Sequence, residues 1–593
     1  MKNQLFLLIS AYSFLLAIFP GSLVDSAIVK TSFGEVDGAE TNGFHLFKRI
    51  PFAKPPLGKL RFQKPEWPEK WKGVWNSKEY GPACLSNSSI TTSPQKWVDE
   101  DCLHINIFTS DKCLTSKNCA VVYYIHGGAI NYDSAVMFND TFLLGTFVNR
   151  DVVLVIPAFR LGIFSHFVVQ DQNIAPNNLA LYDILQGLEF VKREISNFGG
   201  DNKRVTLLGH SYGGSITSML TFSTKINQDK SLFQQAISMS SAHDSEPLEF
   251  QIVKARNFSR RAGCLLPSKL ATKLSQNQQD LYTMKCLQKM NAMDLLRIQN
   301  TMEDEGYPKL ESVVLREPLL QEVPYHEFMN SPNKIPMLTG CTRYEMDHAP
   351  ENKPIAAAVG FENLKEVDEK YRRDWREERY DFGNHSDETQ AIMVQTKMRV
   401  EKLLTNGIPT FLYEYTYPKH AQHTDDLFYI MGVHRFEKDE NEEQLGKVYE
   451  EMFTNFAKDG HPGMGFEMAN LENASYFDVY WDVETGRRPQ MRNGFEKGII
   501  NYWTVDMVAY DKNITALKKA GLFPQNRLQS KRFYSETFPK YQYPYIYFTM
   551  LILTLIFFTG CIVGRCCCRD QTERNLYIRL DGTDNAYHAV KDF

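Results

Sequence analysis

Residues Phe198 to Ser215, FGGDNKRVTLLGHSYGGS, read as a strand, a sharp turn and the start of a helix. Val205–Leu208 is a short apolar run, and the G-x-S-x-G spacing after it puts Ser211 at the apex of the turn. Such an elbow needs glycine at Gly209 and Gly213, because a Cβ at either position would collide with the neighbouring strand or helix. The stretch therefore predicts an α/β fold with an exposed serine nucleophile at the end of a strand.

Apolar, β-rich runs alternate with helical stretches on both sides of this turn. They are Val121–Ile125, Val152–Ile156, Val205–Leu208, Ala236–Ser240, Ile335–Leu338 and Phe411–Tyr415. The clearest helix runs from Leu179 to Asn197, with leucine and isoleucine on one face. Such alternation predicts a large, mostly parallel sheet flanked by helices, with functional loops at the carboxyl ends of its strands. Residues 28–520 contain no Pro/Gly/Ser-rich linker, so we expect one large domain.

Three further segments carry a resemblance to a known family. They are FKRIPFAKPPLGKLRFQKPEWPEKW from Phe47, EDCL at Glu100–Leu103 and FTNFAKDGHP from Phe453. They resemble the type-B carboxylesterase and cholinesterase family, and within it a membrane-anchored nematode branch with a GHSYGG elbow. The resemblance implies the α/β-hydrolase fold, ester chemistry without a cofactor or metal, and a disulfide between Cys84 and Cys102.

A serine hydroxyl is a poor nucleophile, so it needs a general base and an acid that orients the base. In this fold the chain order is serine, acid, histidine. Glu345 stands in MLTGCTRYEMDH after Ile335–Leu338, where the family's G-x-T-x-x-E pattern places its acid. Asp347 is the alternative.

The base is expected after the last apolar run, in KHAQHTDDLFYIMG. The family's H-x-x-D-L pattern falls there on His423. His420 and His434 are the alternatives, because a lone histidine is more often a surface or packing residue. We expect Asp425 and Asp426 to be helix caps or supporting groups.

Catalysis also needs donors where negative charge develops on the reacting carbonyl oxygen. Tyr124–Ala129, YIHGGA, resembles the family's HGGG loop, with Ala129 in place of the third glycine. By that match the backbone N–H groups of Gly128, Ala129 and Tyr212 form the oxyanion hole. The elbow departs from the common GESAG, since His210 and Tyr212 flank Ser211, and this departure concerns substrate range more than activity.

The two ends of the chain predict a type I single-pass membrane protein. Residues 1–27 have the layout of a secretory signal, and residues 545–563 form an uncharged apolar stretch long enough to span a bilayer. Arg565 and Arg569 follow directly, which places the tail in the cytosol. The predicted parts are a signal at 1–27, a lumenal or extracellular domain at 28–523, a stalk at 524–544, a transmembrane helix at 545–563 and a cytoplasmic tail at 564–593.

Cysteines and glycosylation sequons agree with an exported domain, where disulfides persist. Cys264 and Cys286 are candidates for a second disulfide, Cys113 and Cys119 for a small extra loop, and Cys341 is the odd thiol. The N-x-S/T sequons all precede the predicted span. They lie at Asn87, Asn139, Asn257, Asn384, Asn473 and Asn513.

Several functions fit these motifs. The leading hypothesis is a serine esterase acting on small-molecule ester or amide bonds. The alternatives are an acyltransferase that passes the acyl group to a sugar or alcohol hydroxyl, as in assembly of modular glycosides, and a neuroligin-like adhesion protein. A cholinesterase is disfavoured because Trp97 is misplaced for a choline site. The net charge of −5 and the lack of a basic stripe argue against nucleic acid as a partner.

Localisation is expected at an endolysosomal or lysosome-related membrane, or at the plasma membrane. Tyr577 and Tyr587 begin YIRL and YHAV, which resemble tyrosine-based sorting signals.

Overall fold

The computed structural model describes residues 26–86, 97–242, 245–348 and 355–523. Met1–Gly521 form one compact unit and Leu522–Phe593 a second. The predicted signal, span and tail therefore lie almost wholly outside the described residues. Within the described part, no helix combines the length and the apolar character that crossing a membrane requires.

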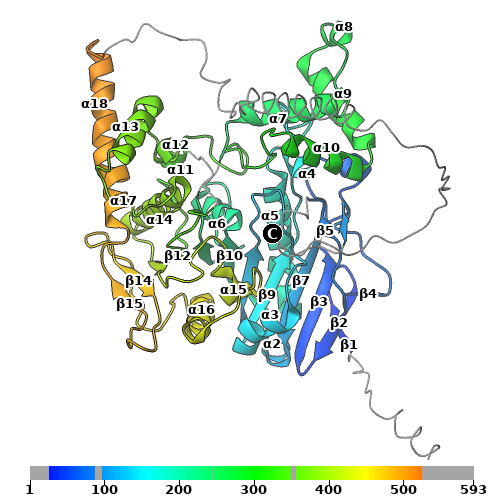
Figure 1. Ribbon diagram of the computed structural model, residues 1–593. Helices are drawn as coiled ribbons and strands as arrows, with labels where there is room; N and C mark the ends of the chain where they lie inside the picture. Colours follow the sequence, from blue (N-terminus) through cyan, green and yellow to red (C-terminus); the bar gives the residue numbers. More distant parts are fainter. Residues whose placement is uncertain (1–25, 87–96, 243–244, 349–354, 524–593) are drawn as a thin grey trace, which may run out of the picture. The chain divides into compact units, whose positions relative to one another are not determined.

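A large sheet runs through the first unit (Figure 1). Its centre follows the order β9-β8-β10-β11-β12-β13-β14, and every neighbouring pair in that series is parallel. These strands are β8 (Cys119–Ile125), β9 (Val152–Pro157), β10 (Gly200–His210), β11 (Gln235–Met239), β12 (Met337–Thr342), β13 (Thr410–Tyr415) and β14 (Tyr476–Val479). Each predicted strand corresponds to one of them.

The two sides of the sheet are antiparallel, so the sheet is mixed and the expectation of a mostly parallel sheet holds only for its centre. β1, β2, β3, β7 and β9 pair in antiparallel succession, and β15 pairs antiparallel with β14. β4 joins β2 in parallel, while β5 and β6 form a separate pair. The additional strands are β1 (Ser26–Lys30), β2 (Glu35–Thr41), β3 (Phe44–Pro51), β4 (Val74–Asn76), β5 (Ala83–Cys84), β6 (Val98–Asp99), β7 (His104–Ser110) and β15 (Gln490–Arg492).

Two predicted elements have different bounds in the structure. The strand expected at Ile335–Leu338 begins at Met337, because Pro336 has no N–H to donate to the ladder, and it continues to Thr342. The helix expected at Leu179–Asn197 is α5 (Leu179–Glu194), followed by a 3-10 turn over Ile195–Phe198.

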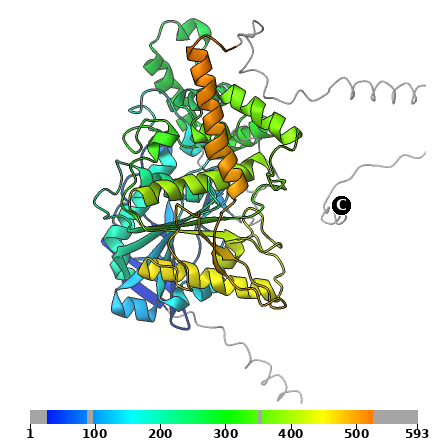
Figure 2. The same ribbon diagram turned by 90° about the vertical axis from the view of Figure 1, so that its left-hand side faces the viewer.

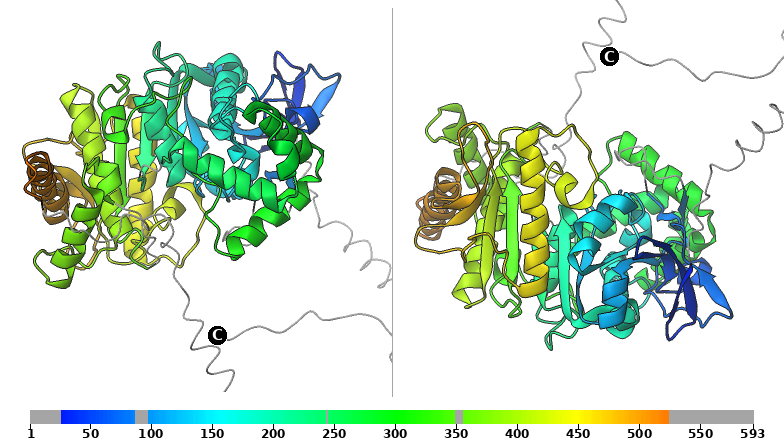
Figure 3. Two further views of the ribbon diagram at one scale, coloured as in Figure 1. Left: turned by 90° about the horizontal axis from the view of Figure 1, so that it is seen from above. Right: turned by 90° about the horizontal axis from the view of Figure 1, so that it is seen from below.

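Helices cover both faces of the sheet. In Figure 2, α14 (Asp387–Thr405) lies above the strands and α16 (Glu440–Asp459) below them. A group of helices formed by α7 (Leu248–Arg261), α8 (Ser268–Ala271), α9 (Gln276–Lys289) and α10 (Ala292–Asp304) lies on the side of the blue and cyan strands. Seen from above in Figure 3, this group is on the opposite side from α18 (Met507–Lys519).

Three disulfides join described residues. Cys84 is bonded to Cys102, Cys113 to Cys119, and Cys264 to Cys286. Cys341 on β12 is a free, buried thiol. Asn139, Asn384, Asn473 and Asn513 are exposed and Asn257 is half-buried, whereas Asn87 lies outside the described residues.

The turn between β10 and α6 (Tyr212–Phe222) packs its backbone closely against the carboxyl edge of the sheet. A Cβ added at Gly209 would lie 2.1 Å from the carbonyl oxygen of Gly213, and one at Gly213 would lie 2.1 Å from that of Ile125 at the end of β8. Backbone atoms cannot move aside as a flexible side chain can. The two glycines therefore allow α6 to begin directly against the sheet.

We expect Gly213→Ala to lower the free energy of unfolding by about 3 kcal/mol or more, because overpacking here acts on backbone. Gly145→Ala, in the exposed part of α3 (Asp140–Thr146), is the matched control, since nothing lies within 4 Å of its added Cβ. That control should be neutral or slightly stabilising, as alanine favours helices. Urea denaturation of the two variants measures the difference, and equal midpoints would contradict the packing argument.

Candidate active site

Ser211 stands between β10 and α6 with φ 58° and ψ −127°. This left-handed conformation is costly for a residue with a Cβ. It is held because the Ser211 N–H donates to the carbonyl of Met239 on β11 at 3.0 Å, in line with the parallel pairing of His210 with Met239. The chain therefore turns at the sheet edge with the serine side chain on the outside of the bend.

His423 contacts both other members of the predicted triad. Its Nε2 lies 2.8 Å from Ser211 Oγ, and its Nδ1 lies 2.5 Å from Glu345 Oε2. Because a carboxylate can only accept, Nδ1 donates to Glu345 and Nε2 is left to accept the serine proton. The structure thus brings together three side chains from the loops after β10, β12 and β13.

Glu345 is fixed from two sides. Its Oε1 accepts from the Thr342 N–H at 2.8 Å, and its carbonyl accepts from the His423 N–H at 2.6 Å. The side chain is fully buried. The carboxylate itself accepts two hydrogen bonds, from the Thr342 N–H and from His423 Nδ1, which offset the cost of burying its charge and hold it against the imidazole.

The alternative residues are engaged elsewhere. Asp347 lies 2.8 Å from His385 Nδ1 and accepts from the Ser386 N–H. His420 lies 2.5 Å from Glu442 and stacks on Phe436. His434 lines a large cavity beside His423. Only the tertiary contacts make this distinction.

The pKa of His423 lies above its usual 6.5. Burial alone would lower this pKa, but the charge and hydrogen bond of Glu345 overcome that effect, and the charge of Glu388 adds to it. Glu345 therefore orients the imidazole and also stabilises its protonated form. A base of this kind takes a proton readily and holds it at pH values where a free histidine would release it.

A second buried pair lies behind the imidazole. The ring of His210 lies 5.0 Å from that of His423, and its Nε2 is 3.9 Å from Asp426 Oδ1, beyond hydrogen-bond distance. Burial, helped by the charge of Glu345, raises the pKa of Asp426 to about 8. Burial and the neighbouring histidines lower the pKa of His210 well below 6.5. Both side chains are therefore neutral near pH 7, so Glu345 remains the carboxylate with the largest effect on the pKa of His423, and Glu388 adds to it. Sequence reasoning gave this pair no such role.

The loop after β8 packs directly against the nucleophile. A Cβ added at Gly127 would lie 3.0 Å from Ser211 Cβ, so a larger residue would push the loop and Ser211 apart by a few tenths of an ångström. Ala129 has φ 54°, a conformation that costs about 1 kcal/mol for a residue other than glycine. The loop is closed by the Asn131 N–H, which donates to the Gly128 carbonyl at 2.8 Å.

Asn131 is itself held by α10, a contact that no sequence pattern signals. Its Oδ1 accepts from Gln299 Nε2 at 2.6 Å, and its Nδ2 donates to Glu303 at 3.1 Å. Asn131 and Gln299 are both buried. This network, which crosses more than a hundred residues of sequence, fixes the backbone that carries Gly128 and Ala129.

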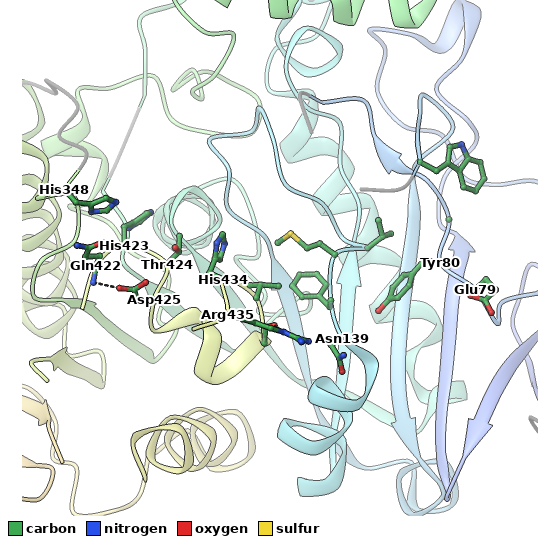
Figure 4. Close-up of a pocket in the computed structure, with 17 residues that line it drawn as sticks. Glu79, Tyr80, Asn139, His348, Gln422, His423, Thr424, Asp425, His434 and Arg435 are labelled. Carbon is green, nitrogen blue, oxygen red and sulfur yellow. Dashed lines mark hydrogen bonds between the residues drawn. The ribbon is translucent and has the colours of Figure 1, made fainter. Parts of the chain in front are cut away.

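Two cavities meet at His423. One, of about 90 Å³, is lined by Ser211, Tyr212 and Ala129 together with Lys309 and Glu311. The other, of about 980 Å³, holds His423, Tyr80, Trp97, Asn139, His434 and Arg435 along its wall (Figure 4). Ser211 lines the smaller cavity and not the larger one, so the smaller one is the candidate reaction site. The Tyr212 hydroxyl accepts from the Val313 N–H at 2.8 Å, which fixes its ring in the wall.

One cluster among the described residues has metal-ligand chemistry. Glu40, His45 and Asp111 have candidate ligand atoms within 4.8 Å of one another. The buried His45 already pairs with the exposed Asp111, with 2.7 Å between Nε2 and Oδ1. None of the three lines either cavity at His423.

Comparison with known proteins gives consistent matches. The model described as "Carboxylesterase family" matches residues 25–503. The para-nitrobenzyl esterase of Bacillus subtilis (strain 168) is 34% identical over 331 residues, which cover 54% of this chain and 63%, less than two thirds, of that protein. Liver carboxylesterase 1F of Rattus norvegicus is 28% identical over 538 residues, 80% of this chain and 93% of that one. A solved structure of a thermophilic PNB esterase superposes with a TM-score of 0.65 at 25% identity, covering 80% of this chain and 99% of that chain.

The pKa of His423 predicts the pH dependence of any reaction that uses it as a base. Only the neutral imidazole accepts a proton, so kcat/KM should fall as pH drops through the raised pKa, with its midpoint above 6.5. Glu345→Gln removes the main stabilising charge and should move that midpoint to lower pH as well as lower the rate. A wild-type midpoint below 6.5, or an unshifted midpoint in Glu345→Gln, would contradict this assignment.

Proposed function

The chain belongs to the carboxylesterase family, and from this premise we propose that it is a serine esterase that hydrolyses carboxylic esters through Ser211, His423 and Glu345. The observation that carries the proposal is the pair of contacts made by His423, 2.8 Å to Ser211 Oγ and 2.5 Å to Glu345. A histidine so placed can accept the serine proton while its other nitrogen stays bound to a buried carboxylate.

The proposed reaction has two halves. Ser211 Oγ attacks the carbonyl carbon while its proton passes to His423 Nε2, and the oxyanion accepts hydrogen bonds from the N–H groups of Gly128, Ala129 and Tyr212. The tetrahedral intermediate collapses, the ester C–O bond breaks, and Nε2 gives its proton to the departing alcohol. Water then attacks the acyl-enzyme with the same base, which releases the acid and returns the proton to Ser211.

The two cavities suggest how the substrate is divided. We place the acyl group in the cavity of about 90 Å³ beside Ser211 and Tyr212, which suits a short acyl chain. The alcohol part then lies toward the cavity of about 980 Å³, because His423 must reach the leaving oxygen and borders both. Small acyl groups with bulky or polar alcohols are therefore the favoured substrate class.

We expect Ser211→Ala to lower kcat by about a million-fold, since triad members act as a unit, and to abolish labelling by a serine-directed phosphonate. Ser218→Ala, on the same helix but hydrogen-bonded to Ser238, is the matched control and should keep both properties. Mass spectrometry of the labelled peptide reads out the modified serine. Labelling that persists in Ser211→Ala would exclude this nucleophile.

Acyl transfer is the second candidate, favoured by the size and polarity of the larger cavity. Asn139, His434 and Arg435 are among the polar groups that could orient a sugar or alcohol hydroxyl beside His423. Water is present at about 55 M, so such an acceptor competes only if it is bound and oriented. The ratio of new ester to free acid, measured at increasing acceptor concentration, separates the two reactions. A ratio no higher than the relative concentrations of acceptor and water predict would exclude acyl transfer and support hydrolysis.

Two further alternatives find less support. A purely adhesive, neuroligin-like role would not require Ser211 and His423 to be in contact, and the phosphonate experiment distinguishes it. A choline ester would need a free aromatic face, but the guanidinium of Arg49 lies 5.4 Å from the centre of the Trp97 ring.

We also propose that the domain is anchored by a single transmembrane helix at residues 545–563 and faces the lumen or the cell exterior. The uncharged apolar stretch, the arginines after it and the sequons before it support this topology. The disulfides Cys84–Cys102, Cys113–Cys119 and Cys264–Cys286 suit an oxidising compartment. Its membrane is proposed to be endolysosomal, lysosome-related or the plasma membrane, with Tyr577 and Tyr587 as sorting signals.

A further inference from the structure

The segment closed by the Cys264–Cys286 disulfide, called here the Cys264–Cys286 loop, exposes apolar side chains. It contains α8 and most of α9. Leu270 is 51% exposed and Tyr282 45%, and Leu274 and Leu281 are also exposed. Isolated apolar residues are common on protein surfaces, but four exposed ones within one short loop make it a candidate contact surface.

Basic residues accompany these apolar ones. Within the loop, Lys269, Lys273 and Lys285 are exposed, while its one acidic residue, Asp280, is buried. Basic residues also outnumber acidic ones over the longer stretch 248–289. It contains eight basic residues, Lys254, Arg256, Arg260, Arg261, Lys269, Lys273, Lys285 and Lys289, and two acidic ones, Glu249 and Asp280. Two of these cations pair with acidic residues outside the stretch, Lys254 with Glu246 and Arg261 with Glu305. The positive charge of the loop itself comes from the exposed Lys269, Lys273 and Lys285.

The base of the loop is fixed to the domain, so the exposed leucines are held outward. Gln288 Nε2 donates to the Arg61 carbonyl at 2.8 Å, and Arg61 in turn donates to the Leu287 carbonyl at 2.8 Å. Ser275 begins α9 with a capping box. In Figures 1 and 2, α8 and the start of α9 stand above α7 and α10 at the top of the molecule. The tip therefore has apolar and basic groups but little of the domain to pack against.

We propose that the Cys264–Cys286 loop docks on an anionic lipid surface that faces the lumen or the cell exterior, the side on which the domain is proposed to lie, with its leucines in the headgroup region and its lysines on the lipid charges. Apolar groups at a tip surrounded by lysine are the chemistry that binds such a surface. The proposed anchor keeps a bilayer within reach, because the stalk 524–544, if extended, spans about 70 Å. The proposal uses that anchor but does not depend on the esterase reaction.

The direct test uses a secreted form that ends at Gly521, which lacks the proposed span. Such a form is expected to fold, because Met1–Gly521 is a compact unit and the thermophilic PNB esterase is matched over 99% of its chain. We expect it to co-sediment with vesicles of phosphatidylcholine and phosphatidylglycerol, much less with phosphatidylcholine alone, and less as salt rises.

Two double variants separate the electrostatic and the apolar contributions to vesicle binding. Lys269→Glu with Lys273→Glu, and Leu270→Ser with Leu274→Ser, should each weaken binding to the anionic vesicles at least about tenfold. The matched control is Met468→Ser with Leu471→Ser, whose side chains are 55% and 44% exposed but lie beside Glu467 and Glu472. This control should bind like the wild type.

Far-ultraviolet circular dichroism of the same samples reports folding independently of activity. Hydrolysis of a water-soluble ester by these samples then separates failure of this proposal from failure of the esterase assignment. Equal binding by wild type and both loop variants would overturn the proposal. So would equal binding to neutral and anionic vesicles, or binding to an acidic protein without binding to vesicles. In full-length protein reconstituted into anionic vesicles, hydrogen exchange over residues 264–286 should be slower than in neutral vesicles, and equal exchange would count against docking.

Discussion

The absence of space for a Cβ at Gly209 and Gly213 is the constraint on which the site depends. With carbonyl oxygens 2.1 Å from either hypothetical Cβ, the first turn of α6 lies directly on β10 and the end of β8. Ser211 is thereby forced into a left-handed conformation at the sheet edge. The parallel order of β10, β11, β12 and β13 then brings the loops that carry Glu345 and His423 to the same edge.

The charge with the largest effect on His423 at this edge is that of the buried Glu345. Glu345 keeps its hydrogen bonds to Thr342 and His423, and its charge raises the pKa of the imidazole. The neighbouring pair, His210 and Asp426, is buried without a hydrogen bond between its nearest atoms, and their shifted pKa values leave both neutral near pH 7. A second carboxylate charge here would compete for the proton that, in the proposed reaction, His423 passes between the serine and the leaving group.

The helices between β11 and β12 contribute both to the candidate active site and to the exposed Cys264–Cys286 loop. Gln299 and Glu303 on α10 hold Asn131 and with it the loop of Gly128, while Lys309 and Glu311, just after α10, line the cavity of the nucleophile. The same insertion carries the Cys264–Cys286 loop outward. One segment thus connects the proposed oxyanion hole to the surface that we propose meets the membrane.

The sequence by itself determined the central strands, the turn at Ser211 and the candidate residues of the triad, because these follow from local periodicity and from motifs only a few residues long. By pattern it placed the acid on Glu345 and the base on His423, with Asp347, His420 and His434 as alternatives, but it could not show which of these side chains lies beside Ser211. In the structure His423 contacts both Ser211 and Glu345, because pairing between strands far apart in the chain brings their loops together. Asn131 with Gln299, His210 with Asp426 and the two cavities were likewise decided only by folding, because contacts between distant segments have no signature in either segment alone.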